Sequence, residues 1–283
     1  MITRSRQAAF TLIELIVVIV LLGILAGGAG LLITTPIQAY SDQLRRQQLV
    51  DQAEMALRQI ARDVRRALPN SIRTIPVGSG WALEMVSTVD GARYRDEIGG
   101  GYVADDDILD FSAPDTKFNF LGLLGTAPAA GQRLVIYNTV PDDFYLAAFN
   151  NFNLGIVTPF GTTLALALNG VEHQLEMAPA FQFSQQSPGQ RAFIVDGPVS
   201  YICIPASRNM TRYSNYAYQA AQPTSAPAGA ASGLVVTQVA ACSITYQAGT
   251  AQRGGLVTIE ITLDDASGES VTLLHQVHVD NVP

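Results

Sequence analysis

AAFTLIELIVVIVLLGILAGGAGLLI, residues 8–33, is an apolar run with one ionisable side chain, Glu14. As a helix with a rise of ~1.5 Å per residue, it is long enough to cross the hydrocarbon core of a lipid bilayer. A carboxylate in such a helix is unfavourable, by on the order of 3 kcal/mol at the bilayer centre and less near its edge. We therefore expect residues 10–35 to form a transmembrane helix in which Glu14 has a functional role.

The residues at the start of this run resemble the start of type IV prepilin-like proteins. A short basic leader, MITRSRQAA (residues 1–9), is followed by FTLIEL (residues 10–15). The resemblance implies that a prepilin peptidase cuts between Ala9 and Phe10, and that the new amino group of Phe10 is N-methylated. The family usually has glycine before the cut, where this chain has alanine, the next smallest residue.

After this cut, Glu14 lies one helical turn from the positive amine of Phe10, ~6 Å along the helix axis. In an assembly its carboxylate could pair with the amine of a neighbouring subunit. Such a pair is strong in a low dielectric, and an unpaired buried charge is unfavourable. The alternative is a lone acid that is tolerated at a helix N-terminus, where the helix dipole favours a negative charge.

Three further stretches resemble minor subunits of this family. LLHQVHVDNVP (residues 273–283) and FIVDGPVSYIC (193–203) resemble the MshO family of the mannose-sensitive haemagglutinin (MSHA) pilus system. QIARDVRRALPNSIR (59–73) resembles the J-type minor pseudopilins of type II secretion. These resemblances imply a subunit of a priming or tip complex for a type IV (MSHA-type) pilus or a type II secretion pseudopilus. The implied partners are other minor pilins or pseudopilins, the major pilin and an inner-membrane assembly platform.

The charges that flank the apolar run predict its orientation. Arg4 and Arg6 precede it, so the positive-inside rule places the N-terminus in the cytoplasm and the rest of the chain in the periplasm. After assembly the chain would lie at a pilus or pseudopilus tip. A removed secretory signal peptide, cut near residues 26–28, is the competing interpretation. The run is longer than the roughly 7–15 apolar residues of a signal peptide, and it contains an acid.

Helical periodicity continues beyond the apolar run, over residues 36–69. Pro36 should kink or loosen the helix because it has no N–H donor, and Pro69 should end it. Apolar residues at three- and four-residue spacing predict an amphipathic stalk with one buried face. The residues of this face are Val50, Ala53, Leu57, Ile60, Val64 and Leu68. The opposite side, which is either solvated or against the acidic surface of a neighbouring subunit, carries Arg58, Arg62 and Arg65.

Alternating apolar and polar residues predict an antiparallel, β-rich globular domain over residues 70–283. The clearest hairpin joins 256–264 to 270–279 through a turn at residues 265–268. The other expected strands are 82–89, 107–111, 133–139, 163–168, 173–177, 191–196, 199–204 and 234–247. The expected fold class is α+β, in which a long N-terminal helix, with a membrane half and an amphipathic half, packs on a pilin-like antiparallel domain.

The chain contains two cysteines, Cys203 and Cys242, each in a strand-like segment. Cys203 alternates with Val199 and Tyr201, and Cys242 alternates with Ile244, so both thiols should point toward the core. An extracytoplasmic domain allows a disulfide between them. Closing a loop of about forty residues would stabilise the domain by roughly 4 kcal/mol in the chain-entropy model. Two buried free thiols are the alternative.

The remaining polar residues match no catalytic motif, and we expect neither enzymatic activity nor a cofactor. The net charge of −7, from 17 Lys and Arg against 24 Asp and Glu, disfavours binding to nucleic acid. Asp105, Asp106 and Asp107 could form a calcium site or a solvated start of a strand, and they lack EF-hand spacing. His275 and His278 fall on opposite faces of one strand, so they cannot share a metal, and His275 is expected to be a hydrogen-bonded core residue.

Two segments are expected to be irregular. Residues 206–233 are rich in Ala, Ser, Pro and Gly, and tyrosines such as Tyr216 and Tyr218 on such a loop could form a binding surface. Residues 141–159 combine asparagines with aromatic residues, and they are expected to cover the sheet or to contact a partner subunit. These segments support the alternative function, a membrane-anchored or pilus-tip adhesin.

Overall fold

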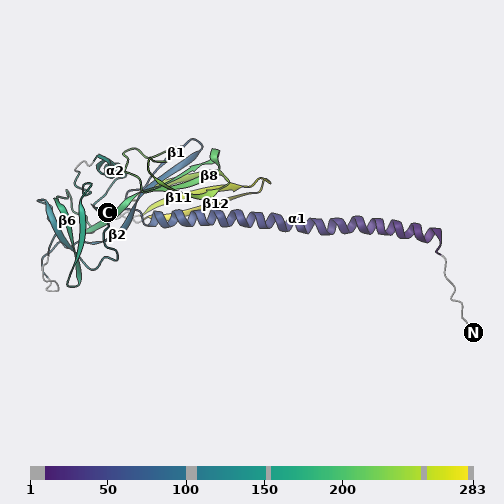
Figure 1. The fold of residues 1–283 in the computed structure, drawn as a ribbon, viewed down its shortest axis with the longest axis horizontal. Helices are drawn as coiled ribbons and strands as arrows, with labels where there is room; N and C mark the ends of the chain where they lie inside the picture. The colour runs from purple at the N-terminus through teal and green to yellow at the C-terminus, as the bar shows by residue number, and fades with distance from the viewer. Residues whose placement is uncertain (1–9, 100–106, 151–153, 250–253, 280–283) are drawn as a thin grey trace, which may run out of the picture. The chain divides into compact units, whose positions relative to one another are not determined.

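The computed structural model describes residues 10–99, 107–150, 154–249 and 254–279, including all side chains except those of residues 29–35 and 150. The chain forms two compact units, Met1–Gln48 and Leu49–Pro283, of which the second is the head. A single helix, α1 (Leu12–Arg65), supplies the first unit and continues into the head. The other elements, drawn in Figure 1, are β1 (Arg73–Val77), β2 (Gly80–Arg93), β3 (Asp115–Phe120), β4 (Arg133–Ile136), α2 (Pro141–Asn150), β5 (Thr163–Asn169), β6 (Glu172–Phe181), β7 (Arg191–Ile204), η1 (Pro205–Ser207), β8 (Asn209–Ser214), β9 (Ala231–Thr237), β10 (Val239–Gln247), β11 (Gly255–Asp264) and β12 (Ser270–Val279).

Three antiparallel sheets form the framework of the head. The largest sheet has six strands, in the order β1-β2-β7-β8-β9, with β4 paired to β7. The other two sheets are three-stranded, in the orders β10-β11-β12 and β3-β6-β5. A long N-terminal helix followed by antiparallel sheets confirms the predicted α+β class.

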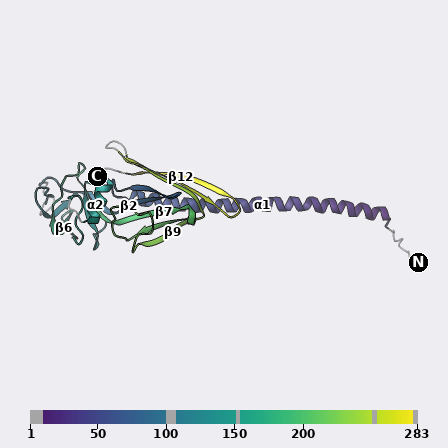
Figure 2. The same cartoon turned by 90° about the horizontal axis from the view of Figure 1, so that it is seen from above.

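The last part of α1 lies in the main hydrophobic core of the head. Ala53, Leu57, Ile60 and Val64 are buried there, so the predicted apolar face of the helix is confirmed. The same core contains side chains from β2, β7 and β8 on the six-stranded sheet, and from the sheet of β10, β11 and β12. Figure 2 shows β12 on one side of α1 and β7 on the other. The helix therefore contributes one core surface that both sheets share.

The hairpin of β11 and β12 follows the predicted alternation. Asp265 organises its turn, because one carboxylate oxygen accepts the N–H groups of Ser267 (2.9 Å) and Glu269 (3.0 Å). Gly268 in the same turn has φ 89°, a conformation that favours glycine. The residues of β11 on the core side are Val257, Ile259, Ile261 and Leu263. The hairpin thus buries one face, as a half-covered antiparallel sheet does.

α1 ends at Arg65, earlier than the predicted stop at Pro69. The chain that follows pairs with β2 instead of extending the helix, and the carbonyl of Arg66 accepts the N–H of Thr88 at 2.9 Å. This pairing gives partners to backbone groups that a helix end would leave unsatisfied. At the predicted weak point, Pro36, the helix continues without interruption.

Several strand boundaries differ from the prediction. Segments 191–196 and 199–204 are one strand, β7, in which Pro198 pairs opposite Val86. A register shift between β2 and β7 lies beside this pair, at a place where a missing N–H donor is tolerated. Segment 234–247 is two strands, β9 and β10. Gln238, between them, has φ 62°, and this left-handed residue redirects the chain from one sheet into another.

Other segments had no strand or helix signal that we recognised. β1, β3 and β8 were not predicted, and residues 107–111 do not form a strand. β8 lies inside the segment 206–233 that was expected to be a loop. The segment 141–159 contains α2, whose Phe144 and Tyr145 are buried in a core cluster with residues of β2, β4 and β7, so it covers the sheet.

Truncating the helix core should destabilise the head. Ile60 is completely buried (0% exposed), so Ile60→Ala should lower the free energy of unfolding by about 2–5 kcal/mol. Met55→Ala is the matched control, because that side chain on the same helix is 72% exposed. It should change the stability by less than about 0.5 kcal/mol. Denaturant unfolding of the full chain, followed by the fluorescence of its one tryptophan, Trp81, measures both. Equal effects would contradict the placement of α1 in the core.

Candidate functional site

The first turn of α1 contains the residues that are expected to guide assembly. Thr11 precedes the helix and caps it: its carbonyl accepts the N–H groups of Glu14 (3.1 Å) and Leu15 (3.2 Å), and its Oγ1 accepts that of Glu14 at 3.4 Å. Glu14 is the acid of the first turn, where the helix dipole stabilises a negative charge by about 0.3–1 kcal/mol. The carboxylate is thus compatible with a free helix end as well as with a partner's cation.

The side chains that follow in α1 are apolar and exposed on all sides of the helix. Every side chain from Phe10 to Gly28 is exposed. Among the large apolar ones in this stretch, the exposed fraction runs from 78% at Leu12 down to 43% at Val18. A helix that is apolar all round is normally buried in protein or in lipid. Glu14 is the one ionisable group in this surface.

In the part of the chain that the structure describes, no helix is both long enough and apolar enough to cross a lipid bilayer. The transmembrane assignment of residues 10–35 stays a prediction, and the side chains of residues 29–35 are outside those described. The leader, residues 1–9, and with it the cleavage residue Ala9, is also outside the described residues.

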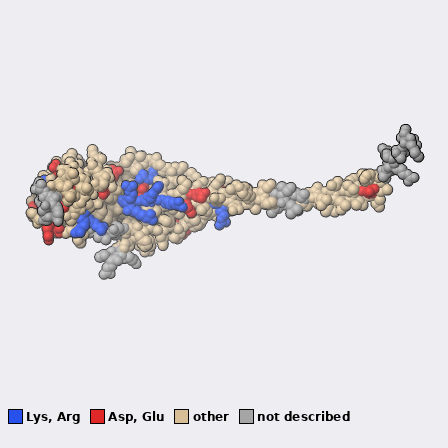
Figure 3. All heavy atoms as spheres, turned by 90° about the horizontal axis from the view of Figure 1, so that it is seen from below, with Lys and Arg blue, Asp and Glu red and all other residues tan. Residues whose placement is uncertain are grey.

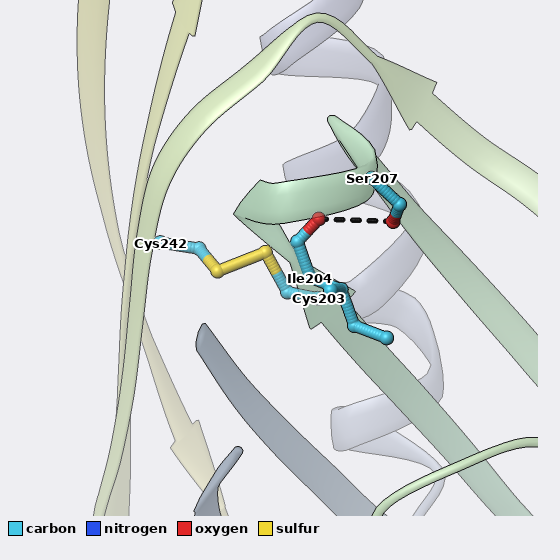
Figure 4. Close-up of a disulfide and its surroundings, with 4 residues drawn as sticks. All are labelled: Cys203, Ile204, Ser207 and Cys242. Atoms are coloured by element: carbon cyan, nitrogen blue, oxygen red, sulfur yellow. Dashed lines mark hydrogen bonds between the residues drawn. A yellow bond between two sulfur atoms is a disulfide. The ribbon is translucent and has the colours of Figure 1, made fainter. Parts of the chain in front are cut away.

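A disulfide joins Cys203 to Cys242, in agreement with the strand alternation (Figure 4). Cys203 lies near the end of β7 in the six-stranded sheet, and Cys242 lies on β10 in a three-stranded sheet. Both residues are buried in the main core. Beside the bond, Ser207 Oγ donates to the carbonyl of Ile204 (3.1 Å) in the turn η1. The disulfide therefore links the two sheets that share α1.

Two tyrosines of segment 206–233, which were considered for an exposed binding surface, are not available for one. Tyr216 and Tyr218 are buried (6% and 5% exposed). The hydroxyl of Tyr216 donates to the carboxylate of Glu84 (2.7 Å), which also accepts Arg73 Nε (2.6 Å). Burial raises the pKa of Glu84, and Arg73 and Tyr216 oppose that shift. Arg73 also donates to the carbonyls of residues 219–220, so this buried ion pair holds the segment against β1 and β2.

The described residues that were considered as metal ligands do not come together in one site. The described residues contain no group of three or more His, Cys, Asp or Glu that could hold a metal ion. Of the calcium candidates, Asp105 and Asp106 lie outside the described residues, and Asp107 Oδ2 lies 3.2 Å from Lys117 Nζ. His275 is half-buried, so its assignment to the core was wrong. His275 lines a surface hollow between α1 and β12 together with Leu57 and Leu273, whereas Val277 and Val279 of the same strand are buried.

One contact that holds α1 to the six-stranded sheet was not predicted from the sequence. Asp63 Oδ2 accepts the hydroxyl of Tyr201 (2.6 Å) on β7 and Arg212 Nε (2.7 Å) on β8. Burial and the neighbouring carboxylate raise the pKa of Tyr201, so its hydroxyl remains a donor. The sequence signal is a single acid among the basic residues of segment 58–66, and it does not identify the partners.

Removing the disulfide should destabilise the head without affecting α1 residues outside it. The cysteines are separated by 39 residues, and Cys203→Ser should lower the free energy of unfolding by roughly 4 kcal/mol under oxidising conditions. Wild-type chain treated with a thiol reductant should lose nearly the same amount. Thermal unfolding of the full chain measures both, and a melting profile that the substitution leaves unchanged would rule out a stabilising bond.

Comparison with known proteins gives one informative match. Residues 4–30 match the family model of the prokaryotic N-terminal methylation motif. No curated protein and no solved structure matches the chain. The matched segment includes Phe10, Glu14 and most of the exposed apolar surface of α1. The motif supports a type IV pilin-like or pseudopilin-like subunit that is a substrate of prepilin peptidase, and it suggests a membrane-anchored N-terminus.

Proposed function

We propose that this chain is a minor pilin-like subunit that joins a priming or tip complex of a type IV (MSHA-type) pilus or a type II secretion pseudopilus. The observation that carries the proposal is Glu14, a single acid in the first turn of a helix whose apolar surface is exposed on all sides. The match of residues 4–30, which include Glu14, to the methylation motif supports the pilin-like part of the proposal. The resemblances of the C-terminal segments to minor subunits support the minor role.

The proposed mechanism begins in the inner membrane. There the apolar surface of α1 is covered by lipid, with the N-terminus cytoplasmic and the head in the periplasm. Prepilin peptidase removes residues 1–9, which leaves a positive N-methylated amine on Phe10. In low-dielectric surroundings a carboxylate and an amine attract strongly, while either charge alone is unfavourable. Pairing of Glu14 with the amine of an adjacent subunit thus provides both attraction and axial register.

The head provides the part of the subunit that selects partners. Its disulfide fits the oxidising periplasm. The assembling segment and the head are connected by α1, which is one continuous helix whose last part lies in the core of the head. We propose other minor pilins or pseudopilins, the major pilin and the assembly platform as partners.

The mature N-terminus is the first test of this function. Mass spectrometry of the chain isolated from its own host cells should find a chain that starts at Phe10 and carries one added methyl group. This expectation follows from the match of residues 4–30 to the N-terminal methylation motif. A start near Ala29 would instead indicate a removed signal peptide and a secreted protein, which contradicts the proposal.

Glu14→Val tests the charge pair. The variant should remain in the membrane fraction, because it is more apolar than the wild type. Its recovery in complexes with other subunits should fall by about tenfold or more, since removing one partner of a desolvated charge pair costs about 2–5 kcal/mol. Leu15→Val, at the next position of the same surface, is the control and should assemble normally. Normal co-isolation of Glu14→Val would exclude a pairing role for the acid.

A further inference from the structure

A group of exposed arginines lies at the end of α1 in the head. Arg58, Arg62 and Arg65 belong to the helix and Arg66 directly follows it; all four are exposed, and they are the basic face. The face of the head that Figure 3 shows has a group of Lys and Arg side chains on it. This concentration of positive charge is unexpected in a chain whose net charge is −7.

The positive charges of the basic face are mostly uncompensated. Arg58 pairs with Glu54, one turn earlier in the helix, at 2.6 Å. Among the described residues, Arg62, Arg65 and Arg66 form no ion pair, and the nearby acid Asp63 is occupied by Tyr201 and Arg212. Like charges four residues apart in a helix, as at Arg58 and Arg62, repel by roughly 0.2–0.5 kcal/mol per pair. An anionic partner would remove this repulsion.

The basic face continues into a hollow on the surface of the head. Arg65 and Arg66 line this hollow, of about 290 Å³, together with Arg191 from β7. The rest of its wall is mostly apolar and includes Pro69, Val89 and Phe193. A hollow lined by arginines and apolar residues suits the side chain of an aspartate or glutamate, whose carboxylate guanidinium groups can bind by charge-assisted hydrogen bonds.

The helix end alone explains only part of this arrangement. Arg62 and Arg65 lie in the last turn of α1, where cations offset the negative end of the helix dipole. That effect does not require Arg66, or Arg191 on another element, around the same hollow. The net charge of −7 opposes long polyanions and anionic lipid surfaces at a distance. A local acidic surface on a protein is therefore the occupant that fits best.

We propose that the basic face docks against an acidic surface of a different pilin-like subunit, with one carboxylate of that subunit in the hollow beside Arg66. This inference rests on the proposed function, since it names a partner class for the head. It assigns a contact that is separate from Glu14, so the two can be tested independently.

Zero-length cross-linking provides a direct test in the host cells that assemble the full chain. The chain has one lysine, Lys117, so Arg62→Lys and Arg66→Lys each add a new amine while they keep the positive charge. A carbodiimide joins such an amine to a carboxylate that touches it, and mass spectrometry identifies the linked peptide. Arg208→Lys is the matched control, because Arg208 is exposed and pairs with Asp264 in the same chain.

The expected result is a link from the new amine of the Arg62→Lys or Arg66→Lys variant to an aspartate or glutamate of another polypeptide that carries its own N-terminal methylation motif. Its yield should exceed that of intermolecular links from Arg208→Lys by about tenfold. It should disappear in 1 M salt, where the screening length falls to about 3 Å. Absence of this link, while Arg208→Lys couples to Asp264, would overturn the proposal, and so would links only to a second copy of the chain.

A charge reversal separates this contact from the proposed function. Arg62→Glu combined with Arg66→Glu should reduce co-isolation with other subunits by about tenfold, while the disulfide, the melting profile and the processing of Phe10 stay normal. Normal co-isolation of this variant would refute the docking contact and leave the role of Glu14 standing. An unprocessed Phe10 in the wild type would refute the proposed function itself.

Duplex DNA or phosphatidylglycerol vesicles that bind the detergent-purified full chain, but not the reversed variant, would assign the face to a different class of partner and overturn the proposal.

Discussion

Apolar side chains run along most of α1, and the need to remove them from water is the constraint on which the rest of the structure depends. In the head this need is met inside the chain, where Ile60 and Val64 have no exposed surface. From Phe10 to Gly28 the corresponding side chains remain exposed. The last part of α1 therefore buries its apolar surface against the sheets of the same chain, whereas the apolar surface of residues 10–28 can be buried only by other molecules.

The architecture of the head follows from the burial of the last part of α1. Two sheets share the buried side of the helix, and two kinds of cross-connection hold them there. The Cys203–Cys242 disulfide joins sheet to sheet. Asp63 joins helix to sheet through Tyr201 and Arg212. Neither connection uses the exposed arginines of the basic face, so the surface of the helix that faces water is free to carry charges for recognition.

The parts of this structure that could be predicted are those in which a local pattern also decides burial. The three- and four-residue spacing of α1 and the alternation of β11 each identify the buried face correctly. The cysteines were paired for the same reason. Contacts between distant segments have no such pattern, which explains why segment 206–233 was misjudged. The buried hydroxyl of Tyr216 donates a hydrogen bond to the carboxylate of Glu84. Nothing near Tyr216 in the sequence indicates that this carboxylate lies beside it.

The candidate site divides in the same way. Phe10 and Glu14 could be proposed from the sequence because an acid in an apolar run is conspicuous on its own. The hollow beside Arg66 has no such signal, because residues of β2 and β7 form part of its wall. The most direct test of the Glu14 pair is a solid-state NMR distance in the assembled complex, with ¹³C in the Glu14 carboxylate and ¹⁵N in the terminal amine of the adjacent subunit. An ion pair should give dipolar coupling that corresponds to a separation of about 4 Å or less. An assembled complex without that coupling would contradict the pairing of Glu14.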